Sequence, residues 1–91
     1  MYLYILKSES TGRYYVGITV ALPTRVAQHN SPQSNPSRWT RGGGSWRLVF
    51  RREFGTAAEA LRAERYIKRM KSRAFVEKLI SADYQLPDLK N

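Results

Sequence analysis

The sequence predicts an α+β domain in which a three-stranded, mostly antiparallel β-sheet is flanked by helices, in the order β-β-α-β-α-α. Runs of β-branched and aromatic residues near the N-terminus and in the middle of the chain are typical of strands. Two helix-start signals follow in the C-terminal half, where apolar residues recur every three or four positions. The 91 residues suffice for one modest hydrophobic core.

The first nineteen residues are expected to form a hairpin with tyrosines on both strands. Tyr2-Leu3-Tyr4 and Tyr15-Val16-Gly17 lie in the two strand-like runs, and Ser10-Thr11-Gly12 between them favours a turn. A short helix over Leu22–His29 follows, with Pro23 in its first turn.

The second half of the chain predicts one strand and two helices. Trp46–Phe54 is rich in strand-forming residues. Thr56 and Glu59 match a capping box, which predicts a helix from there to about Lys71. Ser72 can cap a last helix. We expect residues 1–82 to form the domain and residues 83–91 to form a C-terminal tail.

Charge points to a polyanionic partner. Sixteen Lys and Arg against seven Asp and Glu give a formal net charge of +9, which is typical of nucleic-acid binding. The alternative is a small protein with many solvated surface arginines. Trp46, at the head of a strand, is expected to pack in the core. The residues expected to contact nucleic acid are basic or aromatic ones outside the first hairpin: Arg38, Trp39, Arg41, Lys68 and Lys71.

The composition also excludes several classes of protein. The chain has no cysteine, which rules out disulfides and thiolate zinc sites and is typical of the reducing cytoplasm. No apolar run approaches the ~18 residues that a membrane span needs. We therefore expect a cytoplasmic protein without a membrane partner.

Glu64 is the most unusual residue of the predicted helices, because it lies in the middle of an apolar stripe. A buried carboxylate must be paired or bind a metal, since an unpaired buried charge is too costly. One interpretation is an ion pair with Arg25 or Lys68, and the other is a ligand for Mg²⁺ or Mn²⁺. The residues that share the stripe by spacing are Ala57, Ala60, Leu61, Ile67 and Lys71.

Arg25 and His29 are four residues apart and so share a helix face, where they could clamp a phosphate beside a titratable imidazole. The alternatives are a solvated arginine and a histidine that closes the helix end. Tyr4 and Tyr15 could be ordinary sheet residues. Proton transfer by either would need a phenol pKa below the free value of about 10, which Arg25, Lys68 or a divalent cation could supply.

Taken in this order, the motifs resemble those of the GIY-YIG nuclease superfamily, and above all its small stand-alone bacterial members. The resemblance covers about residues 1–80. Tyr2 stands in place of the first glycine of the signature, Val16 in place of its isoleucine, and Ala21 in place of a helix-capping Asp or Asn. The matching motifs are Tyr2-Leu3-Tyr4-Ile5-Leu6, Tyr15-Val16-Gly17-Ile18-Thr19, Arg25 with His29-Asn30, Arg38-Trp39-Thr40-Arg41, Trp46-Arg47-Leu48-Val49-Phe50, and Glu64 with Ile67-Lys68.

This resemblance implies the GIY-YIG fold and a metal-dependent cut of a phosphodiester that leaves a 3′-hydroxyl and a 5′-phosphate. Carried over by position, Glu64 would bind a single Mg²⁺ or Mn²⁺ ion. Tyr4 would help to take the proton from the attacking water, a role that His29 could share. Arg25 would steady the charged phosphate, and Tyr15 would orient the water or the phosphate.

Two functions agree with these residues. The first is an active endonuclease, with DNA favoured over RNA, that works in DNA repair or processing. The second is a non-catalytic nucleic-acid-binding or protein-interaction module that keeps the GIY-YIG fold. Retention of every expected polar group favours the enzyme. A domain this small can read few base edges, so we expect weak sequence preference and a protein partner for targeting.

Overall fold

The computed structural model describes residues 1–31 and 45–81. The predicted order of elements is confirmed, and the bounds predicted for the first helix, the third strand and the second helix lie within one residue of the observed ones. The elements, in chain order, are β1 (Tyr2–Ser8), β2 (Tyr14–Thr19), α1 (Leu22–His29), β3 (Trp46–Glu53), α2 (Ala57–Met70) and α3 (Arg73–Ile80).

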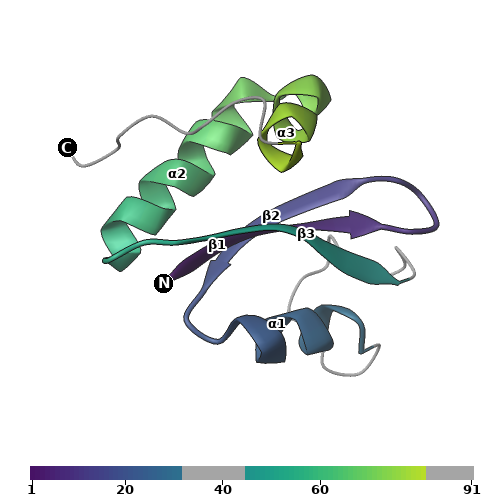
Figure 1. Ribbon diagram of the computed structural model, residues 1–91, viewed down its shortest axis with the longest axis horizontal. Helices are drawn as coiled ribbons and strands as arrows, with labels where there is room; N and C mark the ends of the chain where they lie inside the picture. The colour runs from purple at the N-terminus through teal and green to yellow at the C-terminus, as the bar shows by residue number, and fades with distance from the viewer. Residues whose placement is uncertain (32–44, 82–91) are drawn as a thin grey trace.

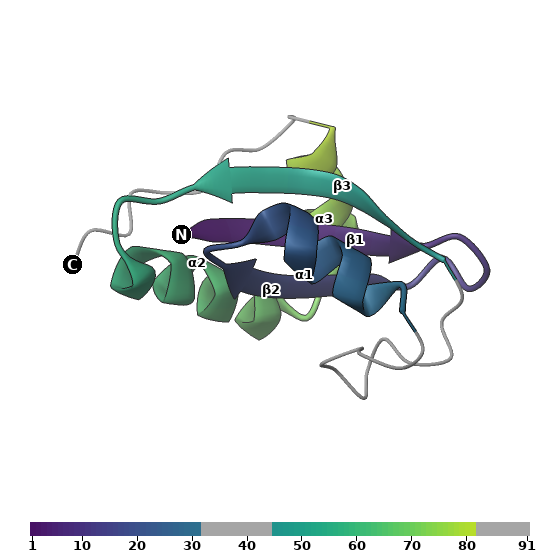
Figure 2. The same cartoon turned by 90° about the horizontal axis from the view of Figure 1, so that it is seen from below.

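The three strands form one antiparallel sheet in the order β2-β1-β3, so β1 is central and β2 is an edge strand (Figure 2). In the β1–β2 pair, Tyr4 lies opposite Gly17. Between β1 and β3 the register shifts, because Ile5 pairs with Phe50 while the next residue of β1 pairs with Leu48. Val49 is therefore the extra residue of a β-bulge.

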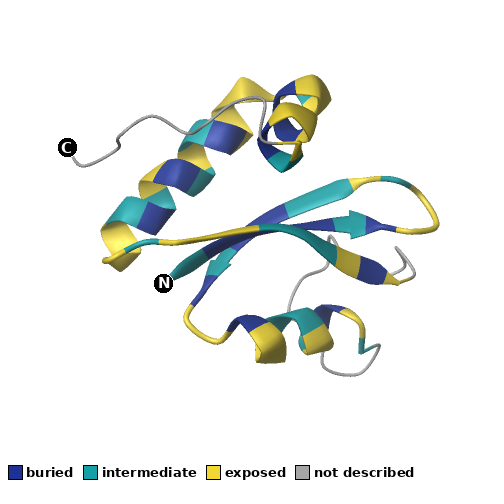
Figure 3. Cartoon of the chain, viewed as in Figure 1, coloured by how far each residue is buried: buried dark blue, intermediate teal, exposed yellow. Residues whose placement is uncertain are grey.

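Helices cover both faces of the sheet. Figure 1 shows α1 on one face, with α2 and α3 on the other. Successive residues of a strand point to opposite faces, and β1 is buried on both (Figure 3). Leu3 and Ile5 pack in the cluster under α2 and α3, whereas Tyr4 and Leu6 pack in the cluster under α1. Tyr4, which belongs to the first signature motif, is thus a core residue on the face of the sheet that α1 covers.

Two of the helices begin at the predicted caps. The Thr56 hydroxyl accepts a hydrogen bond from the Glu59 backbone N–H at 3.2 Å and donates one to the Glu59 carboxylate at 3.1 Å. The Ser72 hydroxyl accepts from the Phe75 N–H at 3.1 Å. Ala21 occupies the N-cap of α1 and, having only a methyl side chain, forms no side-chain capping hydrogen bond.

Asn30, directly after α1, ties the end of that helix to the start of β3. The side-chain Nδ2 of Asn30 donates to the backbone carbonyl of Trp46 at 2.8 Å, and the side-chain Oδ1 of Asn30 accepts from the backbone N–H of Trp46 at 2.6 Å. The Trp46 side chain is buried under α1, which confirms its predicted core role. This two-point attachment fixes the position of His29, the last residue of α1.

Several predicted features lie outside the described residues. They are Arg38, Trp39 and Arg41 together with the C-terminal tail, residues 83–91. Across residues 1–31 and 45–81, no helix is long and apolar enough to cross a membrane.

Candidate active site

The centre of the site is a buried hydrogen bond between two side chains that are far apart in the sequence. Tyr4 comes from the central strand and His29 from the end of α1, and both are almost completely buried. The Tyr4 hydroxyl lies 2.9 Å from His29 Nε2. The chain's single histidine is therefore joined to the tyrosine that the signature predicts.

Tyr15 completes a cluster of three rings from three elements. Its ring centroid lies 4.8 Å from that of His29 and 6.2 Å from that of Tyr4, and both pairs are tilted. These distances are within the range of favourable aromatic contacts. The half-buried Tyr15 ring in the edge strand thus forms the border between the buried Tyr4–His29 pair and the surface.

Gly17 leaves the space that the Tyr4 ring occupies. A β-carbon at this position would lie 2.6 Å from the Tyr4 hydroxyl oxygen, 2.8 Å from Tyr4 Cζ and 3.0 Å from Tyr15 Cε2. The Tyr4 ring therefore extends from β1 across Gly17 of β2. The sequence offered a signal for this close approach, since a glycine inside a strand often marks one, but it could not name the group that approaches.

Arg25 lies one helical turn before His29 and is half-buried. Burial raises the pKa of Tyr4, and the neighbouring Tyr15 and Glu64 raise it further, while the charge and hydrogen bonding of Arg25 act in the opposite direction. The lowered pKa that was expected to be needed for proton transfer is therefore not found for Tyr4 in the protein alone, because burial outweighs Arg25. The phenol stays protonated at neutral pH, and the tautomer of His29 decides which atom donates in its hydrogen bond with Tyr4.

Glu64 lies beside the buried face of α2 and not in its middle. The buried residues of this helix are Ala60, Ala63 and Ile67, whereas Ala57 and Lys71 of the predicted stripe are exposed. The Glu64 side chain is 16% exposed. The predicted stripe was wrong at its two ends, because small and long-stemmed residues fit either a buried or an exposed helix face.

Both interpretations of Glu64 find support in its surroundings. Its carboxylate forms an ion pair with Lys68 at 3.5 Å, as one interpretation predicted. The Lys68 side chain is 54% exposed, and such pairs contribute only about 0–1 kcal/mol, so the carboxylate is not committed to it. Its charge also raises the pKa of Tyr4, although burial of that phenol has the larger effect.

A single carboxylate suits one kind of metal site. Within the described ranges, no group of three or more His, Cys, Asp or Glu side chains could hold an ion. Mg²⁺ commonly keeps several waters and binds through one or two carboxylates together with substrate phosphates. Glu64 fits such an ion as its single protein carboxylate, and does not fit a closed zinc site.

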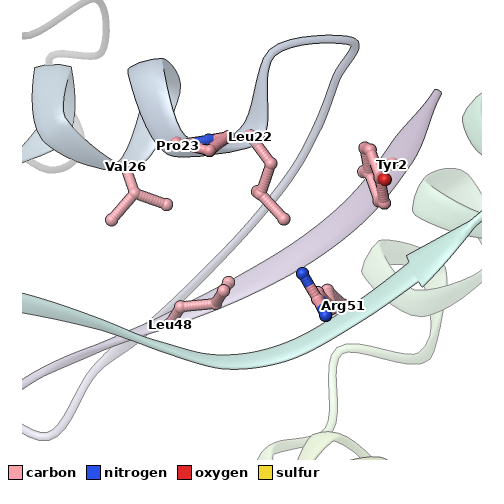
Figure 4. A pocket seen from close by; sticks show the side chains of 6 residues that line it. All are labelled: Tyr2, Leu22, Pro23, Val26, Leu48 and Arg51. Atoms are coloured by element: carbon pink, nitrogen blue, oxygen red, sulfur yellow. The ribbon is translucent and has the colours of Figure 1, made fainter.

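Two hollows adjoin the elements of the site. One, of 390 Å³, lies between α1 and β3 and contains none of the ring cluster (Figure 4). The other, of 480 Å³, contains Tyr15 together with Lys68 and Lys71, the two described residues predicted to contact nucleic acid. The structure thus brings these lysines to the same border of the site as Tyr15.

The sequence of the GIY-YIG catalytic domain family matches residues 1–78, which include every residue of the cluster and Glu64. The chain belongs to the GIY-YIG family. This is a family of nucleases, whose substrates are nucleic acids and whose members generally depend on a divalent metal.

Relatives of this GIY-YIG domain include small bacterial proteins of similar length. A UPF0213 protein of Serratia proteamaculans is 35% identical, over 97% of this chain and 87% of its own. The solution structure of a UPF0213 protein from Bacillus halodurans superposes with a TM-score of 0.56 at 34% identity, covering 89% of this chain and 82% of that one.

A human relative is named for an endonuclease activity. The human structure-specific endonuclease subunit SLX1 is 41% identical over 64 residues, which cover 68% of this GIY-YIG chain and 23% of SLX1. The shared part is therefore one portion of a longer protein.

Proposed function

We propose that this protein is a divalent-metal-dependent endonuclease that hydrolyses phosphodiester bonds, with DNA favoured as substrate. The observation that carries the proposal is the 2.9 Å hydrogen bond between the Tyr4 hydroxyl and His29 Nε2 inside the core. A fold needs no such polar pair there, since burying polar groups is unfavourable unless every group finds a partner. The charges of Arg25 and Glu64 both act on the Tyr4 hydroxyl, and this electrostatic coupling, in a nuclease family, supports a catalytic use.

The pair can relay a proton. In our proposal the Tyr4 oxygen takes a proton from the attacking water while the Tyr4 hydroxyl proton passes to His29 Nε2, which leaves an imidazolium. The raised pKa of Tyr4 favours this route, because a stable phenolate would be costly in the buried position. Tyr4 and His29 thus act together as the general base.

The other residues act on the phosphate and on the ion. Arg25 offers a fixed positive charge for the negative charge that develops on the phosphate oxygens. Tyr15, at the border of the cluster, would orient the water or the phosphate. Glu64 would hold one Mg²⁺ or Mn²⁺ ion, which when bound supplies Lewis-acid stabilisation of the phosphate charge.

The proposed substrate is inferred from the net charge of the chain and from its sequence relatives. The net charge of +9 supports a polyanionic substrate, and the likeness to a structure-specific endonuclease subunit supports branched or otherwise structured DNA. Work in cytoplasmic DNA repair or processing, with a partner for targeting, agrees with both. Residues 1–82 would form the nuclease domain.

The experiment compares how wild type and Glu64→Ala, purified in parallel, cleave a panel of labelled nucleic acids. The panel holds single-stranded, duplex, nicked and branched DNA and single-stranded RNA, each with Mg²⁺, with Mn²⁺ and with a chelator. We expect metal-dependent cuts that leave 3′-hydroxyl and 5′-phosphate ends, absent from Glu64→Ala although it still binds. Absence of metal-dependent cutting on every substrate, with binding intact, would instead support the non-catalytic module.

A further inference from the structure

The two hollows described above differ in chemistry. The one between α1 and β3 is lined mainly by apolar side chains, with Arg51 at its border (Figure 4). The other lies where α2 meets the edge strand β2, and its lining combines aromatic rings with ammonium groups. Its residues are Tyr14, Tyr15, Val16, Lys68 and Lys71. We name this second hollow the β2-edge pocket.

We propose that the β2-edge pocket binds an unpaired nucleotide next to the bond that is cut. This inference rests on the proposed function and narrows its substrate class to nucleic acid with a single-stranded segment at the cleavage site. The pocket would act as a specificity site, with Tyr14 as the stacking residue and Lys68 and Lys71 on the phosphates.

The first support is position. Tyr15 lines the β2-edge pocket and also contacts the His29 ring at 4.8 Å between centroids. Lys68 lines the pocket as well and pairs with Glu64 at 3.5 Å. Two separate residues therefore connect the pocket to the catalytic residues, so a strand in the pocket would continue directly into the site.

The second support is charge. Lys71 ends α2 in the left-handed conformation, at φ 48°, and is exposed. Among the described residues, no ion pair engages Lys71. Lys7 adds positive charge nearby, 5.6 Å from the centroid of the Tyr14 ring, whereas Arg73, 5.0 Å from the same centroid, is paired with Glu77 at 3.4 Å. A pocket lined by positive charge in this way attracts phosphates.

The third support is the aromatic wall. The Tyr14 ring is half-buried, and its hydroxyl donates to the Glu77 carboxylate at 3.3 Å, which holds the ring in place. Burial and Glu77 raise the pKa of Tyr14, so the ring stays neutral and does not repel a phosphate. Bases without a pairing partner stack on rings of this kind, whatever their sequence. In the proposal, the base takes the place of the exposed Arg73 side chain, which lies over the Tyr14 ring in the structure.

The size of the pocket explains why the nucleotide is unpaired. Its 480 Å³ falls in the range of small-ligand sites, about 300–1,000 Å³. One nucleotide is a ligand of that size, whereas a base pair with both its backbones is not. A duplex can therefore reach the lysines at the border but cannot place a base against Tyr14.

The test is fluorescence anisotropy with a labelled thymidine oligonucleotide and with a labelled duplex, both in chelator so that neither is cut. Stacking on one ring contributes about tenfold or more in affinity. We expect Tyr14→Leu to weaken oligonucleotide binding about tenfold and duplex binding less than twofold. Tyr14→Phe, which keeps the ring, should bind the oligonucleotide within twofold of wild type.

Matched lysine variants test the charged wall independently. Lys71→Asn removes the charge with a residue that tolerates the left-handed backbone, and Lys78→Asn removes the same charge from the exposed face of α3. We expect Lys71→Asn to weaken oligonucleotide binding at least threefold more than Lys78→Asn. Melting temperatures identify any variant that fails to fold, and the lysine pair decides the matter if Tyr14→Leu is such a variant.

The proposal is overturned if folded Tyr14→Leu binds the oligonucleotide as wild type does, or loses duplex affinity equally. Equal effects of Lys71→Asn and Lys78→Asn also overturn it. Because these measurements need no cleavage, the two proposals fail separately. If Tyr14→Leu leaves oligonucleotide binding unchanged while cutting still depends on Glu64, the pocket proposal is overturned and the proposed nuclease function stands.

Discussion

Gly17 and Tyr4 face each other across two neighbouring strands at a distance that admits no side chain on the glycine. A β-carbon at Gly17 would lie 2.6 Å from the Tyr4 hydroxyl oxygen. Tyr4 cannot retreat easily, because its side chain is 1% exposed and its hydroxyl is bonded to His29. The glycine is needed here for its size, and the geometry of the whole ring cluster depends on it.

Gly17→Ala should therefore destabilise the fold and disturb the site together. We expect the free energy of unfolding in urea to fall by about 1–3 kcal/mol, the usual cost of overpacking a core, with a loss of cutting in the protein that remains folded. Gly55→Ala is the control, since its β-carbon would meet only Glu59 Oε1, at 3.5 Å. Equal stability of the two variants would contradict the close fit.

Tyr4→Phe isolates the hydroxyl group, because the ring that fills the core is kept. The proposed relay passes through this oxygen, and general base catalysis contributes about 10²- to 10⁴-fold, so we expect the single-turnover rate to fall at least ~100-fold. Tyr2→Phe, on the same face of β1, should retain the rate within about threefold. A Tyr4→Phe rate close to that of wild type would remove Tyr4 from the mechanism.

The raised pKa of Tyr4 predicts how stability changes in alkali. Between about pH 10 and the folded-state pKa, the unfolded chain releases the Tyr4 proton while the folded protein keeps it. The contribution of protonated Tyr4 to the free energy of unfolding is therefore complete below about pH 10. It is lost as the pH rises beyond that value, by up to about 1.4 kcal/mol per pH unit. Urea unfolding from pH 7 to 11 should show a smaller loss for Tyr4→Phe than for wild type, and parallel curves would contradict the assignment.

Asn30→Ala removes both hydrogen bonds that join the end of α1 to Trp46. At about 0.5–1.5 kcal/mol each, we expect a loss of about 1–3 kcal/mol in the free energy of unfolding. Because the same bonds hold His29 in position, the cutting rate should fall as well. The exposed Thr24 on α1 offers the comparison, and a Thr24→Ala variant as unstable as Asn30→Ala would show that the bridge has no special role.

The elements could be predicted from the sequence because their signals are local. Thr56 and Ser72 cap their helices as predicted, and Pro23 stands in the first turn of α1. Tyr4, Tyr15, Arg25 and His29 were found through the resemblance to a family and by their spacing, and the structure brings these four side chains together.

The rest of the site depends on contacts that no local pattern encodes. The pKa of Tyr4 is set by burial under α1, and the sequence does not say how completely that helix covers the ring. Tyr14 was predicted only as part of a hairpin strand, since its pocket exists only once α2 lies along β2. Glu64 was predicted to lie in the middle of a buried stripe, but Ala63 occupies the buried side in the observed helix.

The decisive measurement for a metal ion held by Glu64 is the single-turnover cutting rate as a function of Mn²⁺ concentration, for wild type, Glu64→Asp, Glu64→Gln and Glu53→Gln. If Glu64 holds the ion, Glu64→Asp should need more Mn²⁺ and Glu64→Gln should not cut at any concentration, whereas Glu53→Gln, at an exposed position of β3, should match wild type. A Glu64→Gln protein that cuts within about threefold of wild type would show that Glu64 does not hold the ion.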